Sequence, residues 1–263
     1  MANVLLLDTF NLIRRLYEAN PAGGDAIDDV VEASRRALDR ALRQHQPSHA
    51  VSVVDSHEET WRHQLYSGYK SGRAPTPPAL MDHLQDFKAA FASLGVQSLE
   101  VSHYEADDII GTLAQGVADS GGQVIIISTD KVFLQLLSPQ VRVYHHFERE
   151  FVSPADVQHK FGLTTDQLPD LWALAGDPTN SIKGIPRIGK KTAQALLQSH
   201  GSLAQVLATP LTEGAAEVSR DPAVARVLAH RELALCCQQL ARLKTDVALG
   251  INLRDYRCSI QEE

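Results

Sequence analysis

The stretch that decides the fold reads His103-Tyr104-Glu105-Ala106-Asp107-Asp108-Ile109-Ile110-Gly111-Thr112-Leu113-Ala114, with three carboxylates in four positions before an apolar run. Ser102 and Glu105 have the spacing of a capping box, which predicts that these carboxylates lie in the first turn of a helix. Like charges this close repel each other unless a cation lies among them. Acids also gather at helix N-termini because the helix dipole favours them, so the stretch alone leaves both interpretations open.

Strands on both sides of this stretch are followed by acids. Apolar β-rich runs at 4–7, 50–54, 96–101, 123–127 and 141–144 alternate with helical patterns at 25–45 and about 78–93. The alternation predicts an α/β fold with a mainly parallel sheet. In such sheets, sites form at the carboxyl ends of strands. Asp8, Asp55 and Asp130 each follow a strand, and Glu105 opens the helix after another.

The second half of the chain is mostly helical. From about residue 153 the pattern is helical, a glycine-containing turn at 184–189 runs into a helix, and residues 222–243 predict one last helix. Residues 56–79 are polar, basic and proline-rich toward their end, which indicates an excursion out of the core. We therefore expect an α/β domain at 1–165 and a helical part at 166–263.

Together the acids predict a pocket of hard oxygen ligands for Mg²⁺, with Mn²⁺ as the alternative. Zinc is excluded because no cysteine or histidine pair has ligand spacing. The candidate ligands are Asp8, Asp55, Glu105, Asp107, Asp108, Asp130 and Asp177. Singly, each has a structural alternative: Asp8 and Asp55 as strand-end turn residues, Asp130 as a helix cap and Asp177 as a turn former. Such a pocket supports phosphodiester hydrolysis, in which the metal activates water and stabilises charge on the phosphate.

Composition limits the possible classes of protein. The 263 residues carry a formal net charge of −7, which argues mildly against a simple basic nucleic-acid binder. Basic residues nevertheless gather at 183–191 and at 62–73, so one face is able to attract phosphate. The three cysteines show no metal-ligand spacing, no apolar run approaches the roughly 20 residues that span a bilayer, and the first residues do not resemble a signal peptide. We expect a cytoplasmic monomer with no membrane association.

Two blocks of sequence carry a resemblance to a known family. They read Trp61-Arg62-His63-Gln64-Leu65-Tyr66, followed by Tyr69, Lys70 and Arg73, and Tyr104 to Ala114. They resemble the 5′ nuclease family of bacterial DNA polymerase I exonuclease domains and flap endonucleases. Ser128-Thr129-Asp130-Lys131 and the 184–193 turn extend the match over nearly the whole chain. With no polymerase attached, the chain looks most like the stand-alone exonuclease IX-type flap endonucleases of proteobacteria.

The resemblance implies a PIN-like nuclease core with an arch at 56–79, and a helix–hairpin–helix near 182–199. It assigns Asp8, Asp55, Glu105 and Asp107 to a first metal site, and Asp108 and Asp130 to a position between two sites or at the second. It implies catalytic roles for Lys70, Arg73 and Asp107, with Lys70 offsetting charge on the phosphate. For Lys70, Arg73 and Arg62, the alternative is a solvated charge.

The resemblance also implies two kinds of contact in the helical part and beside the core. The expected DNA-binding residues are Arg62, Tyr69, Lys131, Gly184, Arg187, Gly189, Lys190 and Lys191. A K⁺ ion is expected to bind the main-chain carbonyls of Leu174, Ala175, Lys183, Ile185 and Ile188. For the hairpin, the alternative is an ordinary helix–turn–helix packing element.

The sequence departs from the family pattern at three positions. Val132 and Asn180 stand where the family usually has aspartate, which predicts one tightly bound metal ion and a second that binds weakly. Arg187 stands where the family commonly has a glycine in the hairpin, so the hairpin must accept a side chain there.

The expected activity is that of a Mg²⁺-dependent, structure-specific 5′ nuclease, a phosphodiesterase of replication or repair that acts on DNA with a 5′ flap or branched junction. One alternative is a flap-DNA-binding protein with little catalysis because the second metal site is depleted. Another is an RNase of the related PIN-like fold, which the hairpin and the Trp61 block argue against.

Overall fold

The computed structural model describes residues 1–20, 26–209 and 221–258, whose contacts divide into two compact units. The sheet unit comprises residues 1–60, 75–152 and 244–263, and the helical unit comprises residues 61–74 and 153–243. Each unit is thus assembled from segments that are distant in sequence. The predicted division into 1–165 and 166–263 concerns continuous segments, and it stays a prediction.

The sheet unit is built on a six-stranded sheet with the order β3-β2-β1-β4-β5-β6. The strands are β1 (Asn3–Asp8), β2 (His49–Val53), β3 (Gln97–Leu99), β4 (Gln123–Ile127), β5 (Val141–His145) and β6 (Glu150–Val152). All neighbours are parallel except β6, which runs antiparallel to β5. The predicted α/β fold with a mainly parallel sheet is confirmed, whereas the short edge strand β6 was not predicted.

The register of the central strands brings their carboxyl ends to one edge. Leu6 of β1 pairs with Val51 of β2 on one side and with Ile126 of β4 on the other. Asp8, the last residue of β1, lies opposite Val53. The residues that directly follow β2 and β4 therefore emerge beside the end of β1.

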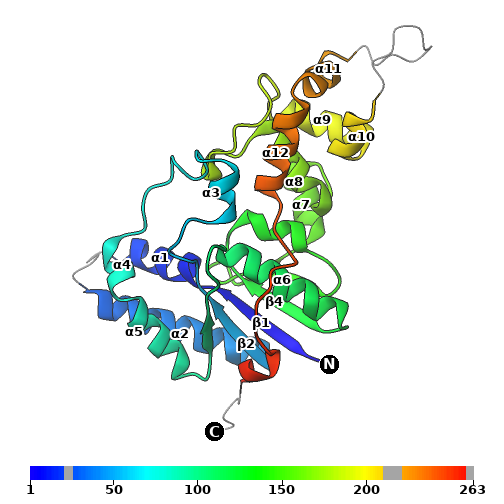
Figure 1. The fold of residues 1–263 in the computed structure, drawn as a ribbon. Coiled ribbons are helices and arrows are strands. Elements are labelled where there is room, and N and C mark those ends of the chain that lie inside the picture. The colour runs from blue at the N-terminus through cyan, green and yellow to red at the C-terminus, as the bar shows by residue number, and fades with distance from the viewer. Residues whose placement is uncertain (21–25, 210–220, 259–263) are drawn as a thin grey trace. The chain divides into compact units, whose positions relative to one another are not determined.

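Helices cover both faces of this sheet (Figure 1). One face packs against α1 (Thr9–Ala19), α2 (Ile27–His45), α4 (Pro78–Asp82) and α5 (Leu84–Ala92), and its core includes Leu5, Leu7, Leu38, Phe87 and Phe91. The helix α6 (Ala106–Asp119) covers the other face and contacts β1, β2 and β4. Because both faces are covered, the strands read as nearly continuous apolar runs.

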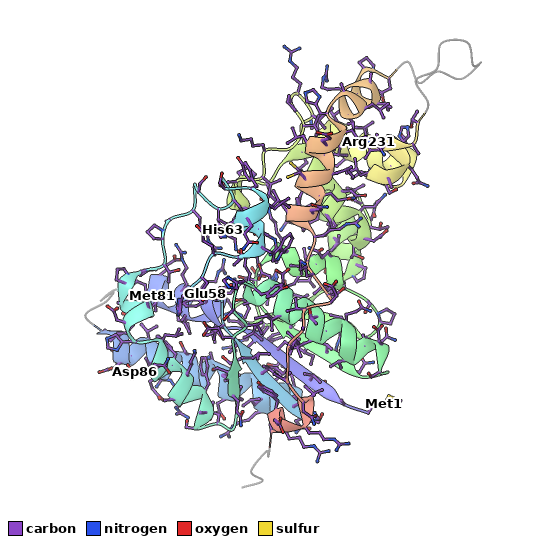
Figure 2. The ribbon with its side chains drawn as sticks, in the orientation of Figure 1. Met1, Glu58, His63, Met81, Asp86 and Arg231 are labelled. Atoms are coloured by element: carbon purple, nitrogen blue, oxygen red, sulfur yellow. The ribbon has the colours of Figure 1, made fainter. Side chains whose placement is uncertain are left out.

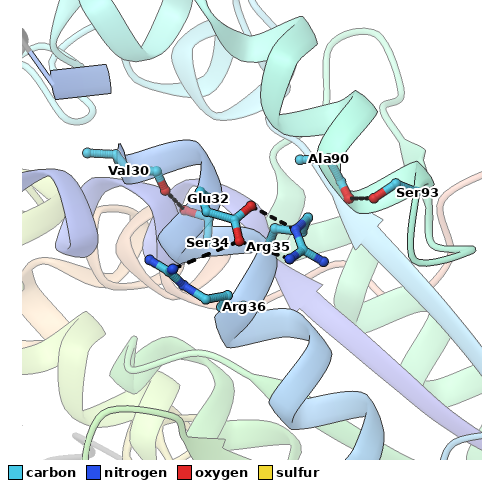
Figure 3. Close-up of polar contacts among 7 residues, drawn as sticks. All are labelled: Val30, Glu32, Ser34, Arg35, Arg36, Ala90 and Ser93. Carbon is cyan, nitrogen blue, oxygen red and sulfur yellow. Dashed lines mark hydrogen bonds and ion pairs between the residues drawn. The ribbon is translucent and has the colours of Figure 1, made fainter. Parts of the chain in front are cut away.

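In the amphipathic helix α2, apolar side chains enter the core and polar side chains are hydrogen-bonded (Figure 3). Val30 and Leu38 are buried in the core, whereas Glu32 lies on the outer side and bonds Arg35 at 2.8 and 2.9 Å. Ser34 is fully buried, and its hydroxyl donates to the carbonyl of Val30 at 2.7 Å. The bond to the preceding turn satisfies a hydroxyl that would otherwise be costly to bury.

The last described segment, 244–258, returns to the sheet unit. The backbone N–H of Val247 donates to the Thr112 hydroxyl on α6 at 3.2 Å, and Arg257 bridges to His49 at the start of β2. A short 3₁₀ helix, η5 (Leu253–Tyr256), also contacts β2. No pattern in the sequence indicated this return.

The helical unit contains α3 (Trp61–Leu65), α7 (Pro154–Phe161), α8 (Leu168–Ala175), α9 (Lys190–His200), α10 (Leu203–Leu207), α11 (Pro222–Ala229) and α12 (Arg231–Ala241), with short 3₁₀ helices η3 (Thr165–Gln167) and η4 (Pro178–Asn180). The prediction of one helix over 222–243 was wrong, because the backbone of His230 (φ −120°, ψ 33°) leaves the helical conformation and separates α11 from α12. Within the residues that the structure describes, no helix is both long and apolar enough to cross a membrane.

Candidate active site

Three acids gather at the carboxyl edge of the sheet. Asp8 ends β1, Asp55 follows β2 by two residues, and Asp130 follows β4 by three. The Ser128 hydroxyl donates to Asp8 at 2.8 Å and accepts from the backbone N–H of Asp130 at 3.0 Å, which ties the ends of β1 and β4 together. The structure thus brings these three residues to one edge of the sheet from adjacent strands, and their role as metal ligands stays a prediction.

The electrostatics of Asp8 are those of a buried acid among acids. Its side chain is nearly buried, at 6% exposure. Burial and then the negative charge of Asp55, with a smaller contribution from Asp130, raise the pKa of Asp8 to about 7, although the hydrogen bond from Ser128 opposes the shift. Such a carboxyl group is poised to lose its proton when a cation arrives nearby.

The start of α6 differs from the predicted capping box. The helix begins at Ala106 with Glu105 as its N-cap residue, and the Glu105 side chain makes no capping hydrogen bond. Asp55 supplies the bond instead, accepting from the backbone N–H of Ala106 at 2.9 Å. The capping-box prediction was wrong because an acid from the end of a neighbouring strand satisfies the helix N-terminus.

The three acids of the opening stretch have different surroundings. Glu105 is buried, with 4% exposure, whereas Asp107 is partly exposed. Asp108 is fully buried and accepts a hydrogen bond from the backbone N–H of Lys244 at 2.9 Å. Asp108 therefore anchors the returning segment to α6, and the metal role predicted for it would have to share that carboxylate.

The donor chemistry of this edge suits a hard divalent cation. Within residues 1–20, 26–209 and 221–258, no three histidine, cysteine or acidic side chains are grouped closely enough to hold a metal ion as they stand. Asp8, Asp55 and Asp130 are nevertheless close enough for the charges of the other two to raise the pKa of Asp8. Carboxylates that repel one another at the edge of a sheet fit Mg²⁺ or Mn²⁺, which bind oxygen ligands and offset that repulsion.

In the helical unit, α3 is held by a buried arginine. Arg62 is 1% exposed, and its guanidinium donates to the carbonyls of Leu240 and Arg242 at 3.0 Å each, near the end of α12. The guanidinium carbon also lies 4.5 Å from the centroid of the Trp61 ring. As it lies here, the Arg62 side chain packs α3 onto α12, and its predicted DNA contact stays a prediction.

The loop after α3 carries the predicted catalytic cations. Tyr69 is buried, with 4% exposure, and packs edge-on against His63 of α3, which Figure 2 labels. Its predicted DNA contact likewise stays a prediction. Lys70 is partly exposed and Arg73 is exposed. The structure thus presents the charges of Lys70 and Arg73 at the surface of the helical unit.

Asp177 and Asn180 form one turn. Asp177 is 2% exposed, and its carboxylate accepts from the Asn180 amide at 2.9 Å and from the backbone N–H of Thr179 at 3.3 Å. Asp177 belongs to the helical unit, whereas the other six candidate ligands belong to the sheet unit. A metal role for Asp177 would have to share oxygens that already stabilise its turn.

Val132, the other departure from the family pattern, lies in the 3₁₀ helix η2 (Lys131–Leu136). Its side chain is buried, at 9% exposure, and its backbone N–H donates to the Asp130 carboxylate at 2.9 Å. Asp130 thus caps η2, which is the structural alternative considered for it. Lys131, a predicted DNA contact in the same helix, is partly exposed.

The predicted hairpin at 184–189 is a tight backbone crossing. A Cβ atom at Gly184 would lie 2.3 Å from the backbone nitrogen of Gly176, so only glycine fits there. Arg187 adopts φ 63°, a left-handed conformation that glycine favours, so the hairpin accepts a side chain here at the cost of backbone strain, and its side chain is exposed. The carbonyl of Leu174 accepts from Ile185, and that of Ile185 accepts from Ile188. Two of the carbonyls predicted to bind K⁺ are therefore already hydrogen-bonded.

Cationic side chains surround this hairpin. Lys183, Arg187, Lys190 and Lys191 are all exposed, and Gly189 is the N-cap residue of α9. The exposed cations and the start of α9 offer positive charge at one end of the helical unit, which is the property that a phosphate contact needs.

Two residues that organise the sheet edge were not among the sequence predictions. Ser128 bonds Asp8, and the Asn11 side chain accepts from both the backbone N–H and the hydroxyl of Thr129, at 3.0 and 3.1 Å. For Ser128, its polar character directly after an apolar strand was the available signal, because polar groups at such positions need partners.

Comparisons with known proteins agree with this architecture. Residues 3–162 match the family model of the 5′-3′ exonuclease N-terminal resolvase-like domain, and residues 163–263 match that of the 5′-3′ exonuclease C-terminal SAM fold. The chain is similar to the flap endonuclease Xni of Psychromonas ingrahamii, at 39% identity over 98% of this chain and 97% of that protein. It is also similar to the Xni of Colwellia psychrerythraea, at 42% identity over 97% and 92% of the two chains.

A solved structure supports the fold. The flap endonuclease of bacteriophage T5, described as a pseudo-enzyme-product complex with DNA and metal ions, superposes with a TM-score of 0.75 over 92% of this chain and 90% of that chain, at 18% identity. Fold and acidic edge together define a PIN-like nuclease core joined to a SAM-like helical part. The chain belongs to the 5′-3′ exonuclease family, and it is a structure-specific 5′ nuclease that acts on DNA.

Proposed function

We propose that this nuclease is a Mg²⁺-dependent flap endonuclease that hydrolyses a phosphodiester bond in DNA bearing a single-stranded 5′ flap. The observation that carries the proposal is the acidic edge of the sheet, where Asp8 is buried and the charges of the partly exposed Asp55 and Asp130 help to raise its pKa to about 7. Folding acids together in this way is unfavourable unless a cation binds there during function.

In this proposal the sheet unit holds the cation. Asp8, Asp55, Glu105 and Asp107 bind it most tightly, Asp130 and Asp108 lie toward a second and weaker position, and Asp177 is the remaining candidate for that position. When bound, a divalent cation lowers the pKa of water and offsets charge on the phosphate. Asp8 then loses its proton and Ser128 orients the ionised carboxylate through the bond seen in the structure.

The helical unit supplies cations for the DNA. Lys70 and Arg73 contact the phosphate near the bond that is cleaved, and Lys70 offsets the charge that develops there. The exposed group at Lys183, Arg187, Lys190 and Lys191 binds backbone phosphates without reading sequence, and Lys131 adds a contact from the sheet unit. A K⁺ ion on hairpin carbonyls, a monomeric state and a cytoplasmic location complete the proposal.

The test is cleavage of a labelled 5′-flap duplex in Mg²⁺, with Asp107→Ala as the inactive control. Cleavage by the unaltered protein that Asp107→Ala abolishes supports the proposal, whereas flap binding without cleavage overturns it. The second outcome would favour the alternative of a flap-binding protein, for which the valine at 132 and the amide at 180 are the motivating observations. Cleavage of RNA in preference to DNA in a competition assay would favour the RNase alternative.

A further inference from the structure

In the helical unit, the turn at Asn180 and Ser181 is hydrogen-bonded to the backbone of the Lys70 loop. The backbone N–H of Lys70 donates to the carbonyl of Asn180 at 3.0 Å, and the N–H of Gly72 donates to the Ser181 hydroxyl at 3.2 Å. Two neighbouring residues of one turn thus fix two positions of a loop more than 100 residues earlier in the chain.

Lys70 needs such support because its backbone is strained. It adopts φ 53°, in the left-handed region that is unfavourable for a residue with a side chain. The strained conformation persists only where surrounding contacts fix it. Besides the bond to Asn180, the carbonyl of Lys70 accepts from the N–H of Arg73 at 2.9 Å, and the preceding Tyr69 is buried. The direction of the Lys70 side chain therefore depends on this loop geometry.

The turn itself is locked through the Asn180 side chain. The Asn180 amide donates to the Asp177 carboxylate, and Asp177 pairs with Ile182 through backbone bonds of 2.8 and 3.0 Å. Because Asp177 is 2% exposed, its carboxylate needs a donor at this point. An aspartate at 180 would present a second negative charge to Asp177 in place of that donor.

We propose that Asn180 is a positioning residue for Lys70: its amide locks the turn onto Asp177, and its carbonyl fixes the left-handed backbone of Lys70. The inference rests on the proposed function, in which the Lys70 ammonium offsets charge on the phosphate. It has a specific consequence: adding an acid at 180 weakens the nuclease through Lys70, although the added carboxylate increases the number of candidate metal ligands.

The first experiment is a thermodynamic cycle on the rate of single-turnover cleavage of a labelled 5′-flap duplex in saturating Mg²⁺. Asn180→Asp is expected to lower the rate roughly 10- to 100-fold, the scale of misplacing a reacting group by about an ångström. In a Lys70→Ala background, the same substitution is expected to change the rate less than about twofold, because the group that it positions is already absent. Equal losses in the two backgrounds, or a gain in rate, overturn the inference.

The second experiment measures hydrogen exchange at the backbone amides of Lys70 and Gly72 in the DNA-free protein. Asn180→Asp is expected to speed exchange at Lys70 by about tenfold, which corresponds to the loss of one hydrogen bond. Ser181→Ala is the matched control, because it removes only the acceptor for Gly72 and so speeds exchange there but not at Lys70. Unchanged exchange at Lys70 in Asn180→Asp contradicts the positioning role.

The two experiments separate the possible failures. If the unaltered protein binds but does not cleave flap DNA, the proposed function fails while the exchange measurement still decides whether Asn180 holds Lys70. If Asn180→Asp does not fold, Asn180→Ala removes the donor without adding a charge. It is expected to show the same dependence on Lys70 at a smaller amplitude, and equal losses in both backgrounds again contradict the proposal.

Discussion

A buried aspartate in each unit, Asp8 in one and Asp170 in the other, has opposite electrostatic surroundings. Asp8 in the sheet unit is 6% exposed, and Asp170 in the helical unit is 2% exposed. Asp170 accepts from the backbone N–H of Leu203 at 2.8 Å and from the amide of Gln238, and the Arg242 guanidinium lies 3.5 Å away. The neighbours of Asp8 include two further acids, and its pKa is raised.

The difference shows that burial of an acid does not by itself mark a functional site. Asp170 is compensated by donors and a cation, so its charge stabilises the packing of α8 with α10 and α12. Asp8 lacks such compensation from a protein cation among the groups that shift its pKa, which is the arrangement expected where an external cation binds. The charges around a buried acid therefore distinguish a structural aspartate from a candidate metal ligand.

The largest expected effect is on the compensated acid. Asp170→Ala leaves the Leu203 N–H and the Gln238 amide without their acceptor, and we expect it to lower the free energy of unfolding by about 3–5 kcal/mol. Urea denaturation followed by circular dichroism measures the change. The exposed Asp166 in η3 is the control, for which Asp166→Ala should stay within roughly 0.5 kcal/mol. A comparably small effect at Asp170 would break the contrast between the two aspartates.

Asp8→Asn is expected to act in the opposite sense on stability and activity. Without the carboxylate, flap cleavage should fall by more than about 100-fold, beyond what loss of an outer-shell partner costs a metal site. The Ser128 bond survives because the amide oxygen of asparagine also accepts. Asp119→Asn, on the exposed end of α6, is the matched control and should cleave normally. Normal cleavage by Asp8→Asn would remove Asp8 from the proposed site.

The same variant should be more stable than the unaltered protein when divalent ions are removed. Because the folded-state pKa of Asp8 is raised from 3.8 to about 7, the folded protein loses stability relative to the unfolded chain as pH rises through that window. At pH 8 we expect Asp8→Asn to gain roughly 1–4 kcal/mol in free energy of unfolding, and at pH 4 almost nothing. Added Mg²⁺ should shrink the gain at pH 8. A pH-independent difference would show that charge on Asp8 is not its cause.

The sequence was sufficient to predict the acidic edge. Apolar runs fix the central strands, parallel pairing aligns their carboxyl ends, and so Asp8, Asp55 and Asp130 come to one edge by a rule that needs only local patterns. The mostly helical second half and the turn before α9 were likewise predicted, because Gly184 and Gly189 punctuate the pattern there.

The features that the sequence did not reveal all depend on distant partners. Nothing local to Asp55 indicates that it caps α6, and nothing near Arg62 indicates that carbonyls of residues 240 and 242 will bury it. The return of 244–258 to α6 is also set by tertiary contacts. Local sequence patterns cannot predict these distant contacts. The sequence around a charged residue is the same whether a partner buries that residue or solvent surrounds it.

His146, a partly exposed residue whose two ring nitrogens are buried, tests whether compensation is general in the sheet unit. Burial, with Arg15 and His145 nearby, lowers the pKa of His146 to about 4, and neither ring nitrogen has a hydrogen-bond partner among the described residues. The stability that the neutral ring permits is present above pH 6.5 and is lost as pH falls toward 4. Between pH 7 and pH 4, the free energy of unfolding of His146→Phe should fall by roughly 1–3 kcal/mol less than that of the unaltered protein. Urea denaturation measures both values. His57→Phe, at an exposed position, should follow the unaltered protein.

The smallest expected effect concerns an exposed cation of the helical unit, where charge is presented to solvent and not buried. Arg187 occupies a left-handed backbone conformation, so Arg187→Gly relieves strain while adding freedom to the unfolded chain, and the free energy of unfolding should change by less than about 1 kcal/mol. Flap-DNA binding should weaken, and the slope of log affinity against log salt should fall by about one, because one phosphate contact is lost. Arg187→Lys keeps the charge and should keep the slope. An unchanged slope in Arg187→Gly would mean that the hairpin binds DNA without this side chain, and the exposed lysines at 183, 190 and 191 would then carry the contact.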